Sequence, residues 1–168
     1  MEISLFTKCL FEFIGTLVLV LLGDGVVAST VLKRSKGFDG GWIVITIAWG
    51  LAVMCGVLIA GPYSGAHLNP AVSVGLAVAG SFPWAYVPGY VAAQLLGGFC
   101  GAVVVYLYYK DHFDATDDPA AKLGVFCTMP AIMDKPRNLF CEVVGTFLLV
   151  FVILAIGNEQ NTPEIGMG

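Results

Sequence analysis

Residues 61–79 read Gly-Pro-Tyr-Ser-Gly-Ala-His-Leu-Asn-Pro-Ala-Val-Ser-Val-Gly-Leu-Ala-Val-Ala, and this segment is the most informative part of the sequence. Its first part contains Gly61, Pro62 and Gly65, which disfavour a helix, within otherwise apolar sequence. Asn69 and Pro70 then predict a helix start, because Asn is a favoured N-cap and Pro suits the first helical position. Residues 80–83, Gly-Ser-Phe-Pro, predict its end. The helix therefore has room for about ten residues, or roughly 15 Å, which is about half of a bilayer's hydrocarbon core.

A half-length helix preceded by irregular backbone is typical of a re-entrant segment in a membrane protein. Irregular backbone survives at membrane depth only where protein or a water-filled cavity satisfies its polar groups. The stretch therefore indicates a pore.

The composition agrees with a membrane location. Of 168 residues, 58% are hydrophobic and 12% are charged, whereas a soluble domain carries about 25% charged residues. The net charge of −4 offers no basic patch for nucleic acid. The five cysteines are scattered and no pair has the spacing of zinc ligands, so we interpret them as small buried apolar residues and expect no metal or cofactor.

Four apolar blocks are long enough to span a bilayer, and the half-helix 70–79 lies between the second and the third. The blocks are 6–32, 42–60, 84–109 and 139–157. In the third block, the small residues Ala93, Gly97 and Gly101 predict a close-packing face. The acidic segment 110–138 is expected to be a solvated surface loop that covers a pore mouth.

An internal repeat organises the chain. Residues 12–21 read Glu-Phe-Ile-Gly-Thr-Leu-Val-Leu-Val-Leu, and residues 142–151 read Glu-Val-Val-Gly-Thr-Phe-Leu-Leu-Val-Phe. Three spans precede the second copy, so that copy is expected to lie inverted in the membrane. We expect residues 1–138 to form the first repeat, with 110–138 as its connecting loop. Residues 139–168 are expected to be the start of a second, incomplete repeat in a truncated protein.

Residues 64–72, Ser-Gly-Ala-His-Leu-Asn-Pro-Ala-Val, resemble the aquaporin and aquaglyceroporin superfamily of major intrinsic proteins. The paired Glu-x-x-Gly-Thr segments and Tyr90-x-x-x-Gln94-x-x-Gly97 fit the same resemblance, which covers nearly the whole chain. It implies an all-α integral membrane bundle of inverted repeats. Here the first repeat has three spans plus the re-entrant half-helix, and the second has only its first span. The family's second Asn-Pro-Ala, and the Arg that follows it, have no counterpart in this sequence.

Trp49 carries the expected selectivity. In the family the second span contributes an aromatic residue to the constriction, usually Phe in water-selective members and Trp in glycerol facilitators. The resemblance is therefore to bacterial glycerol facilitators, and an indole face suits the carbon backbone of a polyol. Val53 lies one helical turn further on and either shares this face or packs within the bundle.

The resemblance also implies roles around the Asn-Pro-Ala motif. Asn69, Pro70 and Ala71 would cap the half-helix, with the Asn69 amide also donating to the permeating molecule. The carbonyls of Gly65, Ala66, His67 and Leu68 would line the pore. Glu12, Glu142 and Gln94 would hold the re-entrant backbone, although intramembrane carboxylates and His67 also leave a proton-coupled mechanism open.

We therefore expect a passive, multi-pass channel for glycerol, similar small polyols and water, without enzyme activity or cofactor. The resemblance implies a homotetramer in the bacterial inner (plasma) membrane, with the N-terminus inside. The positive charges argue for the opposite orientation, since Lys8 alone lies on the N-terminal side. A water-selective aquaporin and a non-conducting fragment stay open as alternatives.

Overall fold

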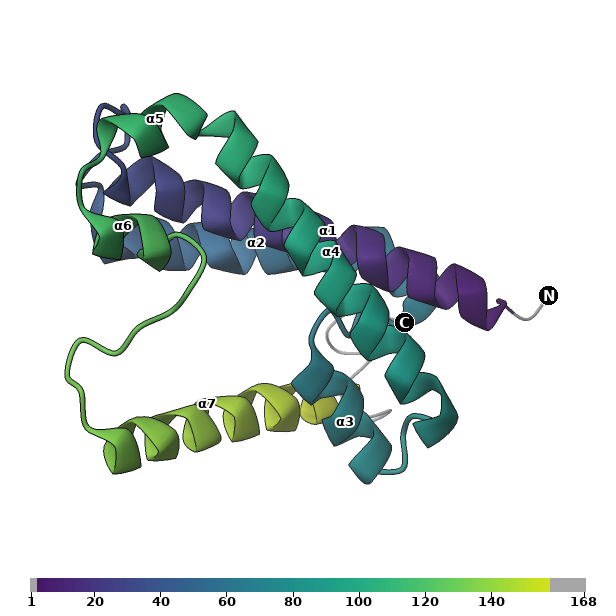
Figure 1. The fold of residues 1–168 in the computed structure, drawn as a ribbon. Coiled ribbons are helices and arrows are strands. Elements are labelled where there is room, and N and C mark those ends of the chain that lie inside the picture. Colours follow the sequence, from purple (N-terminus) through teal and green to yellow (C-terminus); the bar gives the residue numbers. More distant parts are fainter. Residues whose placement is uncertain (1–2, 158–168) are drawn as a thin grey trace.

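The computed structural model describes residues 3–157, and the regular secondary structure of this part of the chain is all helical (Figure 1). The elements are α1 (Leu5–Val31), α2 (Gly41–Ser64), α3 (Pro70–Val78), η1 (Trp84–Tyr86), α4 (Val87–Tyr108), α5 (Lys110–Ala115), α6 (Pro119–Gly124) and α7 (Lys135–Ile156). Within residues 3–157, four helices are long and apolar enough to cross a membrane: α1, α2, α4 together with η1, and α7. The predicted four spans and the short helix between the second and third are confirmed.

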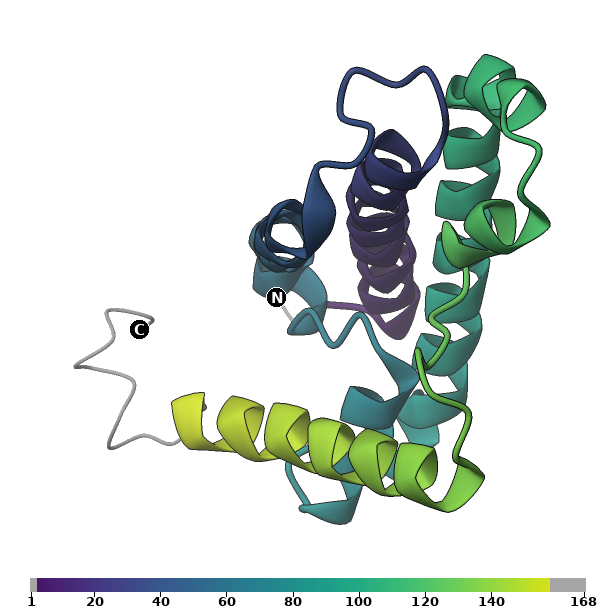
Figure 2. The ribbon, with the colours of Figure 1, turned by 90° about the vertical axis from the view of Figure 1, so that its left-hand side faces the viewer.

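Helix α1 lies at the centre of the bundle, between α2 and α4 (Figure 2). The face of α4 that meets it is built from small residues. A Cβ atom on Gly101 would lie 2.7 Å from the carbonyl oxygen of Leu17, and one on Gly97 would collide with the Phe13 carbonyl. The backbones of α1 and α4 therefore touch at these positions, which confirms the close-packing face predicted for the third span.

The end of α2 differs from the prediction that the second span stops at residue 60. The helix continues through Pro62 to Ser64. Proline forfeits one backbone hydrogen bond, and its fixed φ suits a helix, so a proline in the last turn does not end it. The helix ends at Gly65, which adopts φ 84° and donates its N–H to Gly61 O at 3.1 Å. Glycine takes this left-handed conformation without steric cost.

Helix α3 begins as the Asn-Pro signal predicts. Asn69 is extended (φ −153°) and its side-chain oxygen accepts from Ala71 N at 2.8 Å, with Pro70 in the first turn. The helix has 9 residues and ends before Gly80, whose φ is 76°. It is the half-length helix expected between the second and third spans.

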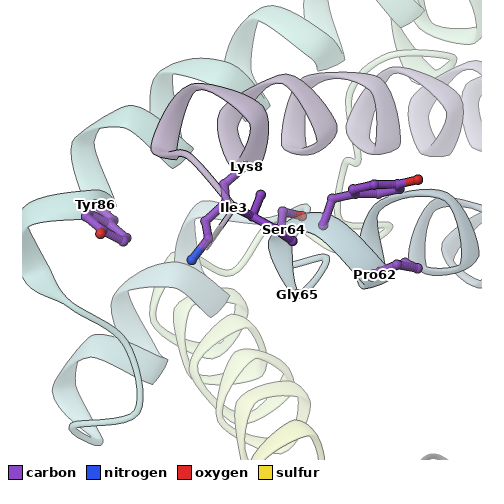
Figure 3. Close-up of a pocket in the computed structure, with 8 residues that line it drawn as sticks. Ile3, Lys8, Pro62, Ser64, Gly65 and Tyr86 are labelled. Carbon is purple, nitrogen blue, oxygen red and sulfur yellow. The ribbon is translucent and has the colours of Figure 1, made fainter. Parts of the chain in front are cut away.

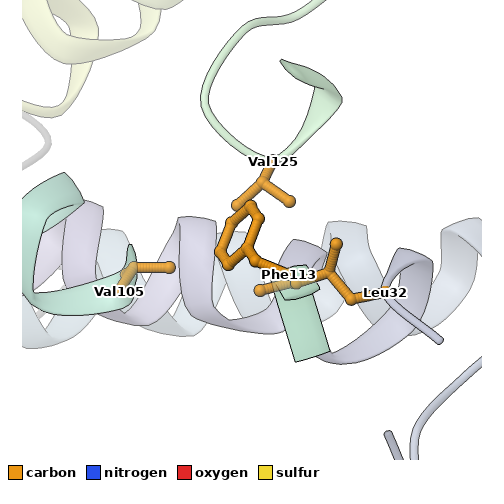
Figure 4. Close-up of a cluster of buried hydrophobic side chains, with 5 residues drawn as sticks. Leu32, Val105, Phe113 and Val125 are labelled. Atoms are coloured by element: carbon orange, nitrogen blue, oxygen red, sulfur yellow. The ribbon is translucent and has the colours of Figure 1, made fainter. Parts of the chain in front are cut away.

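Segment 110–138, expected to be a solvated surface loop, is largely exposed but is not entirely irregular. The segment forms α5 and α6, and its Phe113 and Val125 are 4% and 2% exposed. Figure 4 shows these two side chains against Leu32 at the end of α1, and Val105 of α4 belongs to the same cluster. The segment turns back because burying these apolar side chains covers the exposed ends of two spans.

Polar contacts fix the same segment to the residues that follow α1. The Lys33 N–H donates to Thr116 Oγ1 at 2.9 Å, and His112 Nδ1 lies 3.1 Å from the Lys33 carbonyl oxygen. Thr116 is 1% exposed and donates in turn to the His112 carbonyl at 2.8 Å. The connection after the third span is therefore held against the segment that follows α1.

Helix α7, which corresponds to the expected span 139–157, lies beside α3 (Figures 1 and 2). None of its residues is buried. A Cβ atom on Gly75 of α3 would lie 2.8 Å from Val150 Cγ1, so the two helices meet closely there. The rest of the expected second unit, residues 158–168, lies outside the described residues.

Candidate pore-lining site

The candidate site is the re-entrant loop, residues 65–69, which joins α2 to α3. Besides Gly65, two of its residues have positive φ: Ala66 at 50° and Leu68 at 53°. A side chain in this region costs on the order of 1–3 kcal/mol and persists only where the surroundings hold it. The loop therefore depends on contacts from other elements.

Glu12 of α1 supplies the main contacts. Its carboxylate is 0% exposed and accepts four hydrogen bonds. The backbone N–H groups of His67 and Leu68 donate at 2.9 and 2.8 Å, one to each carboxylate oxygen. Ser64 Oγ donates at 2.6 Å and Gln94 Nε2 at 2.8 Å. A carboxylate is suited to this place because all four neighbours are donors.

Further side chains extend this network to α3 and α4. Gln94 Nε2 also donates to Ser73 Oγ at 3.0 Å, and Ser73 Oγ lies 3.0 Å from His67 Nδ1. The Tyr90 hydroxyl donates to the Ser64 carbonyl at 2.7 Å. The loop is thus tied to α1, α3 and α4 together.

Two side chains of the loop pack as anchors. Leu68 is 6% exposed and lies between α1 and α2, where Cβ atoms on Gly15 and Gly56 would meet its methyl groups at 2.6 and 2.7 Å. The His67 ring packs edge-on against Phe82, with centroids 4.4 Å apart, and lies 4.9 Å from the Tyr90 ring. These contacts fix the side chains of His67 and Leu68 on the protein side of the loop.

The backbone donors of residues 65–68 have partners within the protein, and the backbone acceptors of these residues have none among residues 3–157. The N–H of Gly65 donates to Gly61 O, that of Ala66 to Ser64 Oγ, and those of His67 and Leu68 to Glu12. Within residues 3–157, by contrast, no group donates to the carbonyl oxygens of 65–68. The backbone N–H groups of residues 65–68 are thus satisfied by protein, whereas the carbonyl oxygens of the same residues are left for another molecule.

Asn69 shows the complementary arrangement. Its Oδ1 is occupied by Ala71 N, while the described part of the chain offers no acceptor to its Nδ2. It stands at the N-terminus of α3, where the helix dipole favours a partner with negative charge or an oxygen lone pair. Asn69 therefore presents a donor beside the free acceptors of the loop.

A polar hollow of about 370 Å³ borders the start of the loop. It is lined by Ile3, Lys8, Gly61, Pro62, Tyr63, Ser64, Gly65 and Tyr86. Figure 3 shows the Lys8 side chain reaching between Tyr86 and Ser64, and Lys8 Nζ lies 5.5 Å from the Tyr86 ring centroid. The hollow thus lies beside Gly65, the first residue of the loop.

Trp49 and Val53 lie on α2, upstream of the loop. The Trp49 indole is half-buried against Gly23 of α1, and Val53 is 44% exposed.

Glu142 is not brought to the loop. It is exposed on α7 and receives no hydrogen bond from residues 3–157. Instead it lines an apolar hollow of about 470 Å³ between α3 and α7, together with Ala71 and Phe147. The structure thus groups Glu12 and Gln94 with the loop and separates them from the second glutamate.

Sequence reasoning missed two polar residues of the network, Ser64 and Ser73. Ser64 opens the Ser-Gly-Ala-His motif, and Ser73 lies one helical turn after Asn69, so both positions carried a signal. Within residues 3–157, no group of three or more His, Cys, Asp or Glu side chains could hold a metal ion.

A re-entrant loop and half-helix, held by a buried carboxylate beside helices long and apolar enough to span a bilayer, are an arrangement of integral membrane proteins. A model of the family described as "Major intrinsic protein" matches residues 1–167. The chain belongs to this family.

Curated relatives of the chain include proteins named as glycerol uptake facilitators. The chain is 57% identical over 151 residues to a "Probable glycerol uptake facilitator protein" of Thermotoga maritima, covering 90% of this chain and 64% of the relative. It is 52% identical over 154 residues to the "Glycerol uptake facilitator protein" of Bacillus subtilis, covering 92% and 56%. The chain therefore spans less than two thirds of these relatives' lengths.

A solved structure shares the fold. The aquaglyceroporin from Plasmodium falciparum matches with a TM-score of 0.64 and 39% sequence identity. The match covers 70% of this chain and 48% of the aquaglyceroporin.

Proposed function

We propose that this chain contributes the permeation path of a passive channel for glycerol, other small uncharged solutes and water. The observation that carries the proposal is the division of hydrogen bonds in the re-entrant loop. The donors of 65–68 are held by protein, and the carbonyl oxygens have no protein partner among residues 3–157. A row of free acceptors is what a file of hydroxyl groups requires.

The remaining residues have distinct parts in this proposal. Glu12 and Gln94 position the loop, while Pro70 and Ala71 begin the half-helix behind Asn69. Asn69 Nδ2 donates to the oxygen of the passing molecule. Trp49 and Val53 form an apolar wall along which the carbon side of a polyol slides. Glu142 would play the Glu12 part for a second loop, which the described residues do not contain.

A passive mechanism accounts for Glu12 better than proton coupling does. A coupling carboxylate must take up and release a proton, yet Glu12 is 0% exposed and surrounded by four donors. A proton on the Glu12 carboxylate would point at one of these four donor groups and displace its hydrogen bond. No enzyme activity and no cofactor are part of the proposal.

The names of the relatives support glycerol as the solute, because facilitators of glycerol uptake are 52–57% identical to this chain. We extend the proposal to a multi-pass location in the bacterial inner membrane and to a homotetramer. The sequence holds a single Asn-Pro-Ala, so residues 3–157 supply one wall of the path.

Stopped-flow measurement on proteoliposomes tests the proposal. In an outward glycerol gradient, vesicles with the protein should equilibrate faster than protein-free vesicles, with a rate independent of any pH gradient. Trp49→Phe should lower the ratio of glycerol to water permeability, whereas Trp42→Phe, at a position 75% exposed, should leave it unchanged. Rates equal to those of empty vesicles would refute conduction by this chain. A pH-dependent flux would favour the proton-coupled alternative.

A further inference from the structure

Gly23 of α1 faces the Trp49 indole directly. A Cβ atom built on Gly23 would lie 2.5 Å from Cη2 and 2.6 Å from Cε3 of the six-membered ring. Carbon atoms in contact are usually ~3.5–4.0 Å apart. The indole therefore occupies the place that a side chain at position 23 would need.

Backbone geometry does not explain this glycine. Gly23 lies inside α1, and its φ is not among the positive values of the chain. In a helix interior glycine is less favourable than alanine by about 1 kcal/mol. Packing against Trp49 is thus the feature that distinguishes the site. A Cβ atom on Gly25, two residues further along the same helix, would have no atom of residues 3–157 within 4 Å.

A methyl group at position 23 would displace the ring. Restoring ordinary contact from 2.5 Å requires a movement of about 1 Å away from α1. The methyl group would be fixed to the backbone of α1, which is held by its own helical hydrogen bonds. The Trp49 indole would therefore move, because a side chain can change its position more easily than a helix backbone. The displaced ring would stand further out from the surface that it shares with Val53, which is 44% exposed.

We propose that Gly23 is a positioning residue for solute selectivity: it lets the Trp49 indole lie flat against α1 and so sets the clear width of the path at Trp49. This inference rests on the proposed function, in which Trp49 forms one wall of that path. Glycerol is wider than water, so a narrower path obstructs glycerol first.

The test compares Gly23→Ala with Gly25→Ala, which makes the same change where space is open. In proteoliposomes, Gly23→Ala should lower the glycerol-to-water permeability ratio by roughly tenfold, the order expected for one methyl group in a fitted site. Gly25→Ala should leave the ratio unchanged. In a Trp49→Phe background, Gly23→Ala should have a smaller effect, because the two changes act through one ring.

A second readout does not need conduction. With Trp42→Phe and Trp84→Phe, Trp49 becomes the single tryptophan, since the chain has 3. Gly23→Ala should then change the emission maximum and acrylamide quenching of Trp49, and Gly25→Ala should not.

The two readouts separate the possible failures. Equal ratios for Gly23→Ala and Gly25→Ala would overturn the inference if Trp49→Phe does alter the ratio. An unchanged Trp49 emission in Gly23→Ala would overturn it as well. A changed emission without any glycerol flux in the unmodified protein would refute the proposed function while supporting the contact between Gly23 and Trp49.

Discussion

Replacing Glu12 by glutamine tests the contact on which the re-entrant loop depends. The exchange keeps the size of the side chain and turns one acceptor oxygen into an NH₂ donor. Each carboxylate oxygen of Glu12 accepts from one backbone N–H and one side chain: His67 N and Ser64 at Oε1, Leu68 N and Gln94 at Oε2. In either orientation of the new amide, one backbone N–H therefore faces another donor.

The cost follows from these contacts. The side-chain neighbours can adapt, since the Ser64 hydroxyl has the Ala60 carbonyl at 3.2 Å as another acceptor and Gln94 can turn its amide round. The orphaned backbone N–H costs about 1–3 kcal/mol, and the remaining hydrogen bonds lose the charge that makes them about twice as strong. We expect a total of about 3–5 kcal/mol, or a fall in Tm of roughly 6–20 °C for a chain of this size.

Thermal unfolding in detergent micelles, followed by circular dichroism, provides the measurement. Glu142→Gln is the matched control, because Glu142 opens the same Glu-x-x-Gly-Thr pattern but receives no hydrogen bond from residues 3–157. Its Tm should change by less than about 1 °C, as for an exposed substitution without specific contacts. Equal shifts for Glu12→Gln and Glu142→Gln would refute the assignment of four structural hydrogen bonds to Glu12.

Three further predictions concern other contacts. Thr16 is 6% exposed and its Oγ1 has no partner among the described residues, so Thr16→Val should keep or raise the Tm; a clear loss would contradict this. Gly101→Ala should lower the free energy of unfolding by about 1–3 kcal/mol, because the new Cβ atom would meet the α1 backbone. Gly50→Ala should leave it unchanged, because residues 3–157 place no atom within 4 Å of that Cβ, and denaturant titration measures both values. Lys110 lies outside the spans, and its hydrogen bond to Asp114 raises its pKa. The contribution of this pair to the stability of the fold is therefore complete at pH values below the ordinary lysine pKa, and it is lost as the pH rises through the raised pKa. Asp114→Asn should return the pKa to its usual range in an NMR titration, and an unchanged value would contradict the pairing.

The sequence was most informative where a local rule acts alone. Asn69-Pro70 is a complete helix-start signal, and α3 begins there. The spans follow from apolar length, and Gly97 and Gly101 follow from the spacing of small residues. Each of these features can be derived from one short segment.

One feature that the sequence did not reveal is a local effect that was misjudged, and the others depend on distant partners. Pro62 looked like a helix breaker, but in the last turn of α2 it only removes one hydrogen bond. Segment 110–138 looked solvated because of its acids, whereas Phe113 and Val125 bury themselves against the end of α1. That Glu12 reaches the loop while Glu142 does not depends on where α1 and α7 pack, which no local pattern specifies.

The positive φ values of Ala66 and Leu68 have a consequence for biogenesis. The loop conformation is unfavourable for the isolated segment, and its stabilising groups come from α1, which is synthesised earlier, and from α4, which is synthesised later. A ribosome that has just delivered α3 has not yet supplied Gln94 or Tyr90. The segment from Ser64 to Asn69 therefore gains its last side-chain tethers only after the third span has been synthesised.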